Sequence, residues 1–296
     1  MPAHDGQTRL NRFGDKSLLV TALRVAGQCL PGDYVRTFVY LNLIYKPRLA
    51  LRRAINTFYR MDHVYAVIKE FKGSYKGPFS ILEFGVADGY AFAKKAFATR
   101  YLGMEDSIVC HGFDSFEGLP ETDDRRDLGN IAGGDWKAGQ YRGRYEELRG
   151  YLDERYKNCR LHRGMFDATL TPEFLESLRV DKPILVWIDC DYYTSARVVF
   201  ERLIPYLPSG CVIYFDEYEF NFGSRFTGES RLVHEINRGA FGDGIELVLD
   251  SDLSWDLRRC YRFINQAAPY VFERKAELRR LTTQWQKRAG GDSPLP

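Results

Sequence analysis

Two short apolar runs, each ending in acidic residues, constrain the fold of this chain more than any other feature. The run Ile184–Ile188 leads into Asp189-Cys190-Asp191, and the run Cys211–Phe215 leads into Asp216-Glu217. An apolar run of about five residues bounded by turn signals is typical of a parallel strand that is buried on both faces. Because the carboxyl ends of parallel strands meet at one edge of a sheet, we expect the four carboxylates to converge there. Oxygen ligands of this kind suit Mg²⁺ or Ca²⁺, so the pattern predicts a divalent metal site.

The rest of the chain alternates strand and helix patterns in the same way. The expected strands are residues 79–84, 108–113, 159–163, 184–188 and 211–215. The expected helices that connect them are residues 90–101, 145–156, 172–178 and 194–207. This alternation predicts an α/β fold with a doubly wound, mostly parallel sheet.

The two ends of the chain follow other patterns. Residues 48–72 carry apolar side chains at helical spacing, and after an expected helix near 229–238 the segments 245–249 and 259–264 predict an antiparallel hairpin. Residues 270–288 predict a basic helix. The expected organisation is a helical N-terminal extension over residues 1–76, which acts as a lid or an oligomer contact, a catalytic domain over 77–268, and a basic helix and tail over 269–296.

The charge is distributed unevenly, although the net charge is only +2. Residues 1–76 carry 13 Lys and Arg against 5 Asp and Glu, and residues 257–296 carry 9 against 3, so the middle of the chain is acidic. An acidic core fits a site for a metal ion, whereas the basic ends could face the core itself, a second copy or an anionic membrane surface. We favour a homo-oligomer over peripheral membrane contact. No nucleic-acid motif accompanies the basic residues, so we expect no nucleic-acid partner.

The cysteines and the apolar runs indicate a location for the protein. The six cysteines are scattered without a CxxC pair, which is typical of reduced core thiols. No signal pattern opens the chain, and no apolar run approaches the roughly 18 residues of a membrane span. We therefore expect a cytoplasmic protein.

The turn after the first expected strand indicates the kind of cofactor. Glu83 begins the string EFGVADG, whose glycines let a ligand approach the backbone and the N-terminus of the following helix. The string lacks the GxGxxG pattern, and Glu83 would repel a pyrophosphate but attract a cationic group such as an amino-acid ammonium. The second strand ends at Asp114, where a carboxylate can accept hydrogen bonds from ribose hydroxyls. S-adenosylmethionine carries both an ammonium and a ribose.

Six strings between residues 81 and 218 carry a resemblance to a known family. They are Ile81–Gly89, Gly112–Glu121 with its FDSFEGLPE core, Gly164–Leu170, Ile188–Tyr193, Leu203–Leu207 and Phe215–Tyr218. In this order and spacing they resemble the metal-dependent class I methyltransferases that are similar to macrocin O-methyltransferase, the TylF-like family. The resemblance implies a Rossmann-like sheet of seven strands with a terminal antiparallel hairpin.

The resemblance also assigns roles to residues of this chain. It implies that S-adenosylmethionine is bound by Glu83, Gly85, Val86, Gly89, Asp114, Ser115, Phe166 and Asp189. It implies that Mg²⁺ or another divalent cation is bound by Asp191, Asp216 and Glu217. The family more often shows two aspartates where Asp216-Glu217 stands, and Cys190 replaces a commoner glycine.

The expected reaction is transfer of a methyl group from S-adenosylmethionine to a hydroxyl of a sugar or of another natural-product or glycan acceptor. The metal would bind that hydroxyl and lower its pKa, and a vicinal diol fits best because a metal can chelate two neighbouring oxygens. Asp191 or Asp189 is the candidate proton acceptor, and His234 is a rival. Trp136 and Tyr141, in the long loop after Asp114, are candidate lid residues, with core packing as the alternative.

Three other functions compete with this one. Asp189-Cys190-Asp191-Tyr192-Tyr193-Thr194 has the DxDxT form of a haloacid-dehalogenase-like phosphatase, although that motif normally follows the first strand of its fold. A glycosyltransferase could use the same DxD to bind a nucleotide sugar through a metal. A methyltransferase-like scaffold could bind a membrane or a protein through its basic ends, but it would need none of these acidic residues together.

Overall fold

The computed structural model of the chain describes residues 22, 33–47, 51, 62–75, 77–128, 136–220, 222–254 and 258–267. The expected helix over 270–288, most of the segment 48–61 and the tail lie outside these residues. The chain divides into two compact units, Met1–Arg60 and Met61–Pro296. The first unit contains the helix α2 (Asp33–Val39), which continues into the π-helical turn η2 (Tyr40–Tyr45).

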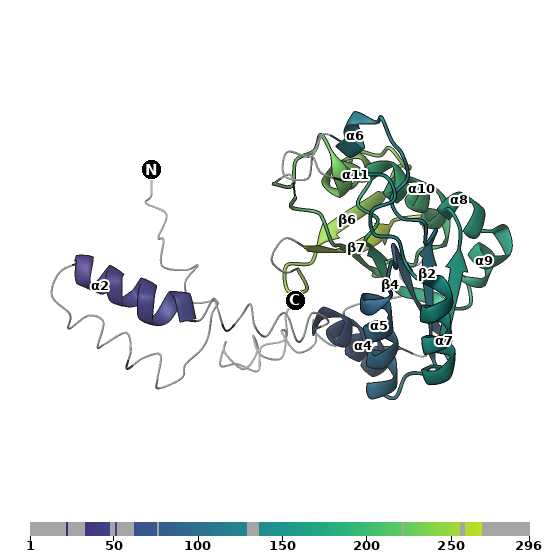
Figure 1. Cartoon of the computed structure of the whole chain (residues 1–296), viewed down its shortest axis with the longest axis horizontal. Coiled ribbons are helices and arrows are strands. Elements are labelled where there is room, and N and C mark those ends of the chain that lie inside the picture. The colour runs from purple at the N-terminus through teal and green to yellow at the C-terminus, as the bar shows by residue number, and fades with distance from the viewer. Residues whose placement is uncertain are drawn as a thin grey trace, which may run out of the picture. The chain divides into compact units, whose positions relative to one another are not determined.

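The second unit is built on one sheet of seven strands (Figure 1). The strands are β1 (Phe79–Phe84), β2 (Ile108–Asp114), β3 (Cys159–Arg163), β4 (Lys182–Ile188), β5 (Val212–Phe215), β6 (Ile245–Leu249) and β7 (Arg259–Asn265). They are arranged in the order β3-β2-β1-β4-β5-β7-β6. The strands β1 to β5 pair in parallel, whereas β7 is antiparallel to both β5 and β6. The predicted fold class, with its terminal antiparallel hairpin, is confirmed.

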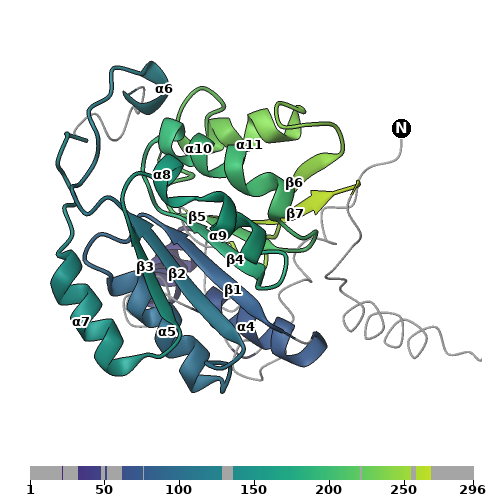
Figure 2. The same cartoon turned by 90° about the vertical axis from the view of Figure 1, so that its right-hand side faces the viewer.

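Helices cover both faces of the sheet, as Figure 2 shows. One face carries α4 (Asp62–Ser74), α5 (Tyr90–Tyr101) and α7 (Tyr145–Arg155), and the other carries α8 (Phe166–Thr169), α9 (Pro172–Ser177), α10 (Tyr193–Leu203) and α11 (Gly228–Asn237). The short helix α6 (Arg125–Leu128) belongs to the long loop after β2. Two clusters of buried apolar side chains fill the two layers, which explains why the central strands are apolar on both faces.

Most expected elements match the structure, and the differences have local causes. The helix expected over 194–207 ends at Leu203 and gives way to a 3₁₀ turn, η3 (Ile204–Tyr206), because Pro205 has no backbone N–H to continue the helical pattern. The short helices α6 and α8 were not expected, since four residues are too few to show helical periodicity. The cysteines at 110, 159, 190, 211 and 260 are free and buried, as predicted.

The helix α4 packs in the core of the second unit, although the expected N-terminal extension over residues 1–76 includes it. Val64, Val67, Ile68 and Phe71 are fully buried in the layer that also contains residues of β1 and α5. Glu70 of this helix forms an ion pair with Arg262 of β7, with Oε2 and Nη2 2.7 Å apart. The role of residues 1–76 as a lid or an oligomer contact stays a prediction. Among the described helices, none combines the length and the apolar character that crossing a bilayer requires.

We expect Phe71→Ala to lower the free energy of unfolding by about 3–5 kcal/mol, because it leaves a cavity in this layer. Urea denaturation of the full chain, followed by circular dichroism, measures the change. The control is Lys69→Ala, an exposed position on the same helix, which should stay within about 0.5 kcal/mol of the wild type. Equal effects of the two substitutions would contradict the placement of α4 in the core.

Candidate functional site

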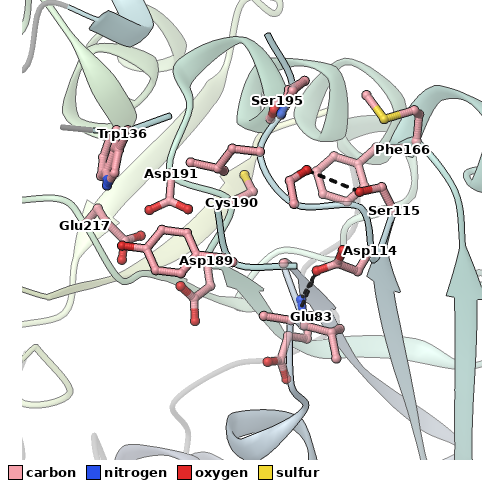
Figure 3. Close-up of a pocket in the computed structure, with 18 of the residues that line it drawn as sticks. Glu83, Asp114, Ser115, Trp136, Phe166, Asp189, Cys190, Asp191, Ser195 and Glu217 are labelled. Carbon is pink, nitrogen blue, oxygen red and sulfur yellow. Dashed lines mark hydrogen bonds between the residues drawn. The ribbon is translucent and has the colours of Figure 1, made fainter. Parts of the chain in front are cut away.

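A cavity of about 270 Å³ opens where β1, β2, β4 and β5 end. Its lining residues are Glu83, Gly85, Val86, Ala87, Ala91, Asp114, Ser115, Gly118, Leu119, Pro120, Trp136, Tyr141, Gly164, Met165, Phe166, Asp189, Cys190, Asp191, Ser195, Glu217 and Phe220. Figure 3 shows Asp114, Ser115 and Phe166 on one side of the cavity, Asp191, Glu217 and Trp136 on the other, and Asp189 between them. Most of the residues predicted to bind the cofactor or the metal therefore face one space.

The glycine turn after β1 lies directly against the end of β4. Gly85 has a φ of +93°, and a Cβ atom at this position would lie 1.7 Å from the backbone oxygen of Asp189. The Gly85 N–H donates to the carbonyl of Phe113 at 3.0 Å, and the Asp189 N–H donates to the carbonyl of Phe84 at 2.9 Å. Only glycine fits such a conformation at such a distance from a neighbouring backbone. The turn is therefore fixed between β2 and β4.

Asp114 holds this turn in place. Its Oδ2 accepts hydrogen bonds from the backbone N–H groups of Val86, at 2.7 Å, and Ala87, at 2.8 Å, and its Oδ1 accepts one from Phe116 at 2.5 Å (Figure 3). The expected role of Asp114 was to bind ribose hydroxyls. Each carboxylate oxygen carries two lone pairs, so the side chain can still accept a hydroxyl from the cavity while it fixes the turn.

Glu83 is fully buried at the floor of the cavity and is paired with a buried lysine. Its Oε2 lies 2.8 Å from Nζ of Lys95, which in turn lies 3.5 Å from the centre of the Trp187 ring. Its Oε1 has no hydrogen-bond partner among the described residues. Burial raises the pKa of Glu83, although the charge of Lys95 opposes the shift. An unsatisfied carboxylate oxygen beside the cavity fits the ammonium group of S-adenosylmethionine.

Three carboxylates lie close enough to share a cation. Oxygen atoms of Asp189, Asp216 and Glu217 all lie within 4.8 Å of one another. We name these residues the carboxylate trio. Their hard oxygen donors fit Mg²⁺. The metal ligands that the resemblance implied were Asp191, Asp216 and Glu217. The three carboxylates that lie closest together include Asp189 instead of Asp191, and the ligand role of Asp191 stays a prediction.

An aromatic pair across β4 and β5 orients two members of the trio. Trp187 and Tyr214 are register partners, and their rings stack with centres 3.6 Å apart. Trp187 Nε1 donates to Oδ2 of Asp189 at 3.3 Å, and the Tyr214 hydroxyl donates to Oδ1 of Asp216 at 3.0 Å. Each acid follows its aromatic partner by two residues, and side chains two apart in a strand point to the same face.

The electrostatics of the trio differ from one residue to the next. Burial raises the pKa of Asp189 and of Glu217 well above the ordinary values, and the neighbouring acids add to both shifts. Burial would also raise the pKa of Asp216, but hydrogen bonds and charge from Arg258 lower it overall. Arg258 Nε lies 2.7 Å from Oδ1 of Asp216. Oε2 of Glu217 is buried without a partner among the described residues, so one ligand position is unsatisfied.

Asp191 lies next to the trio and lines the cavity. Its φ of +62° is in the left-handed region, which is uncommon for a residue other than glycine and is often found at functional sites. Burial and the charge of Asp216 raise the pKa of Asp191 to about 7. The rival base His234 lies on α11 and is not among the residues that line the cavity.

Aromatic side chains from two loops close the cavity on the side of the trio. The candidate lid residues Trp136 and Tyr141 both line it, and so does Phe220. The ring of Trp136 lies edge-to-face with the rings of Tyr192 and Phe220, each with centres 5.9 Å apart. These rings form an apolar wall of the cavity on the side of the carboxylate trio.

A buried aspartate fixes the long loop after β2. The carboxylate of Asp127 in α6 accepts hydrogen bonds from the backbone N–H and the hydroxyl of Thr194, at 2.9 and 2.7 Å. The loop is thereby fastened to the first turn of α10, close to the cavity.

Sequence reasoning missed Lys95, Asp127 and Arg258, which hold acidic groups or loops of the site in place. Lys95 is fully buried on the face of α5 that also buries Phe92, Ala96 and Thr99. A lysine at helical spacing from apolar residues is a signal that the sequence contains. Asp127 and Arg258 lie in loop or strand-end segments whose partners are 67 and 42 residues away in the chain. No local pattern predicts such pairings.

Comparisons with known proteins agree with this geometry. Residues 82–218 match the family model Methyltransf_24, described as a methyltransferase domain. Among solved structures, the calicheamicin methyltransferase CalS11 is 20% identical, covers 88% of this chain and 99% of its own, and superposes with a TM-score of 0.52. The O-methyltransferase NovP is 19% identical over 69% of this chain and 78% of its own, with a TM-score of 0.47. At 20% identity the likeness to CalS11 establishes the fold alone. A search of curated proteins gives no match.

We expect Gly85→Ala to abolish cofactor binding and to lower the free energy of unfolding by at least about 2 kcal/mol, because the new Cβ collides with the Asp189 backbone at a positive φ. Calorimetric titration with S-adenosylmethionine and urea denaturation measure the two effects. Gly150→Ala in α7 is the matched control, since no atom lies near its Cβ position and alanine favours a helix by up to about 1 kcal/mol. If Gly85→Ala bound S-adenosylmethionine with the wild-type affinity, the turn at Gly85 would not be part of the cofactor site.

Proposed function

We propose that this chain, whose residues 82–218 match a methyltransferase domain, uses S-adenosylmethionine and is a Mg²⁺-dependent O-methyltransferase acting on a sugar hydroxyl. The acceptor is a sugar-bearing natural product or a glycan. The single observation that supports this proposal best is the carboxylate trio, two of whose members, Asp189 and Glu217, line the same cavity as Glu83 and Gly85 of the glycine turn. A methyl donor and an activated hydroxyl would meet in that cavity.

One half of the cavity suits the cofactor. S-adenosylmethionine supplies the methyl group as part of a sulfonium. Glu83 would accept hydrogen bonds from its ammonium through the unpartnered Oε1, and the turn with Gly85, Val86 and Gly89 would accommodate the methionine part. The ribose side is formed by Asp114 and Ser115, with Phe166 and Asp189 completing the lining.

The other half of the cavity suits a metal and the acceptor. Asp189, Asp216 and Glu217 would hold the Mg²⁺, with Asp191 beside them. A bound Mg²⁺ lowers the pKa of an acceptor hydroxyl. Arg258 keeps Asp216 ionised, and the Trp187–Tyr214 pair keeps Asp189 and Asp216 aimed at one point.

A proton must leave the acceptor hydroxyl as its oxygen attacks the methyl carbon, while the carbon–sulfur bond of the sulfonium breaks and S-adenosylhomocysteine leaves as a neutral thioether. Asp191 is the preferred acceptor of that proton, because it lines the cavity outside the trio and is free of the Trp187 hydrogen bond that restrains Asp189. The backbone turn of Asp191 places the carboxylate between Glu217 and the cofactor side of the cavity (Figure 3). Asp189 is the alternative.

The aromatic wall supports a sugar acceptor. Trp136, Tyr141 and Phe220 present flat apolar surfaces with polar groups beside them, which is how binding sites commonly orient a partly polar ligand. CalS11, which shares this fold, is described as a TDP-rhamnose 3'-O-methyltransferase. We further propose a cytoplasmic homo-oligomer that binds no nucleic acid, with peripheral membrane contact as the less favoured alternative.

We expect the purified chain to transfer a labelled methyl group from S-adenosylmethionine to a sugar acceptor, to lose this activity in excess chelator, and to regain it with added Mg²⁺. A panel of sugar, catechol and lipid-linked glycan acceptors identifies the acceptor class. Phosphate release and sugar transfer are measured in parallel to test the phosphatase and glycosyltransferase alternatives. Full activity in the chelator would refute the metal role, and the absence of methyl transfer to any hydroxyl would refute the proposed reaction.

We expect Asp189→Asn to weaken metal binding by about tenfold or more, which corresponds to about 1.4 kcal/mol, and Asp191→Asn to weaken it less. The reason is that an oxygen of Asp189 belongs to the trio. Calorimetric titration with Mn²⁺ as the probe measures the affinity in the absence of an acceptor. Asp252→Asn, at an exposed position, is the matched control. A larger loss of Mn²⁺ affinity in Asp191→Asn than in Asp189→Asn would instead identify Asp191 as the metal ligand.

A further inference from the structure

A second, much smaller cavity adjoins the first beside Asp191 and Glu217. It measures about 10 Å³, and its lining residues are Trp136, Asp191, Glu217, Tyr218, Phe220, Thr227, Gly228, Glu229 and Ser230. Four of these residues, Trp136, Asp191, Glu217 and Phe220, line the main cavity as well. The small cavity is therefore a side pocket of the acceptor half of the site.

Glu229 is a buried acid that the proposed reaction does not use. It lies in the first turn of α11 and is only 1% exposed. Its Oε2 accepts a hydrogen bond from the backbone N–H of Glu217 at 3.1 Å, whereas its Oε1 has no partner among the described residues. A buried polar atom without a partner costs about 1–3 kcal/mol, so its presence calls for an explanation.

The size of the side pocket limits what can satisfy that oxygen. A space of this volume holds about one water-sized group, and thus a single hydroxyl rather than a ring or a phosphate. A carboxylate oxygen accepts a hydrogen bond from such a hydroxyl. Asp191 and Glu217 border both cavities, so a hydroxyl in the side pocket would be next to the one at the trio.

We propose that Glu229 binds a second hydroxyl of the acceptor, on the carbon adjacent to the one that bears the methylated oxygen. Glu229 thereby selects acceptors with two neighbouring hydroxyls over simple alcohols and phenols. This inference rests on the proposed O-methyl transfer. Glu229 sets specificity here through contact with the acceptor. The hydrogen bond from the Glu217 N–H holds Oε2 of its carboxylate, which leaves Oε1 as the oxygen that can accept a hydroxyl.

The test compares acceptor pairs in wild type, Glu229→Ala and Glu229→Gln. Each pair is a diol and the same molecule without the neighbouring hydroxyl: the best sugar acceptor with its deoxy analogue, and catechol with phenol. We expect the wild type to prefer the diol by at least tenfold in kcat/KM. Glu229→Ala should remove most of that preference by raising KM for the diol, and Glu229→Gln, which keeps the shape and one acceptor oxygen, should retain part of it.

Controls separate this role from a structural one. Glu246→Gln, at an exposed position in β6, is the matched control and should keep the wild-type preference. Titrations with S-adenosylmethionine and with Mn²⁺ check that each variant retains its cofactor and metal sites. If Glu229→Ala does not fold, Glu229→Gln decides the question by a reduced preference for the diol.

Four results would overturn the inference. They are a wild type without preference for the diol, variants that retain the wild-type preference, an equal loss of activity towards both members of each pair, and a loss of Mn²⁺ affinity in Glu229→Gln as large as in Asp189→Asn. With methyl transfer to a hydroxyl established in the wild type, each of these refutes the role of Glu229 alone. Failure of the wild type to methylate any hydroxyl would refute the proposed function and this inference together.

Discussion

The concentration of acidic side chains at one edge of the sheet is the constraint on which the rest of the site depends. Glu83 and Glu229 are buried there, and Asp189, Asp216 and Glu217 are partly buried. Of these, Glu83 and Asp216 have basic partners among the described residues, Lys95 and Arg258. Enclosed carboxylates without a partner repel one another and resist ionisation. The arrangement is therefore costly for the chain alone, and a bound cation would offset that cost.

The parallel sheet explains why these groups meet although they are far apart in the chain. The strand β1 lies between β2 and β4, and β5 follows β4 on its other side. The ends of β1 and β2 carry Glu83 and Asp114, whereas the ends of β4 and β5 carry the carboxylate trio. The site is thus divided along the sheet into a half suited to the methyl donor and a half suited to the acceptor, as expected for ligands at the carboxyl ends of parallel strands.

Local patterns in the sequence predicted the strands, because buried parallel strands are short apolar runs with sharp ends. They also predicted which acids would gather, since each follows such a run directly. The period of two in a strand explains why Asp189, just past the end of β4, lies on the face of Trp187, whose indole N–H donates to it, and the ligand role of Asp191 stays a prediction. Arg258 was missed, because its contact with Asp216, 42 residues away in the chain, forms only when distant segments pack.

The backbone joint between Gly85 and Asp189 couples the two halves of the site. Gly85 lies so close to the Asp189 carbonyl that no side chain fits between them, and the Asp189 N–H is bonded to the carbonyl of Phe84. The side chain of Asp189 at the same time belongs to the carboxylate trio. Methyl transfer requires the donor carbon and the attacking oxygen in line and in contact, and a small displacement of either is expensive. In the proposed reaction, the relative position of donor and acceptor would therefore be set by a rigid contact between two strand ends.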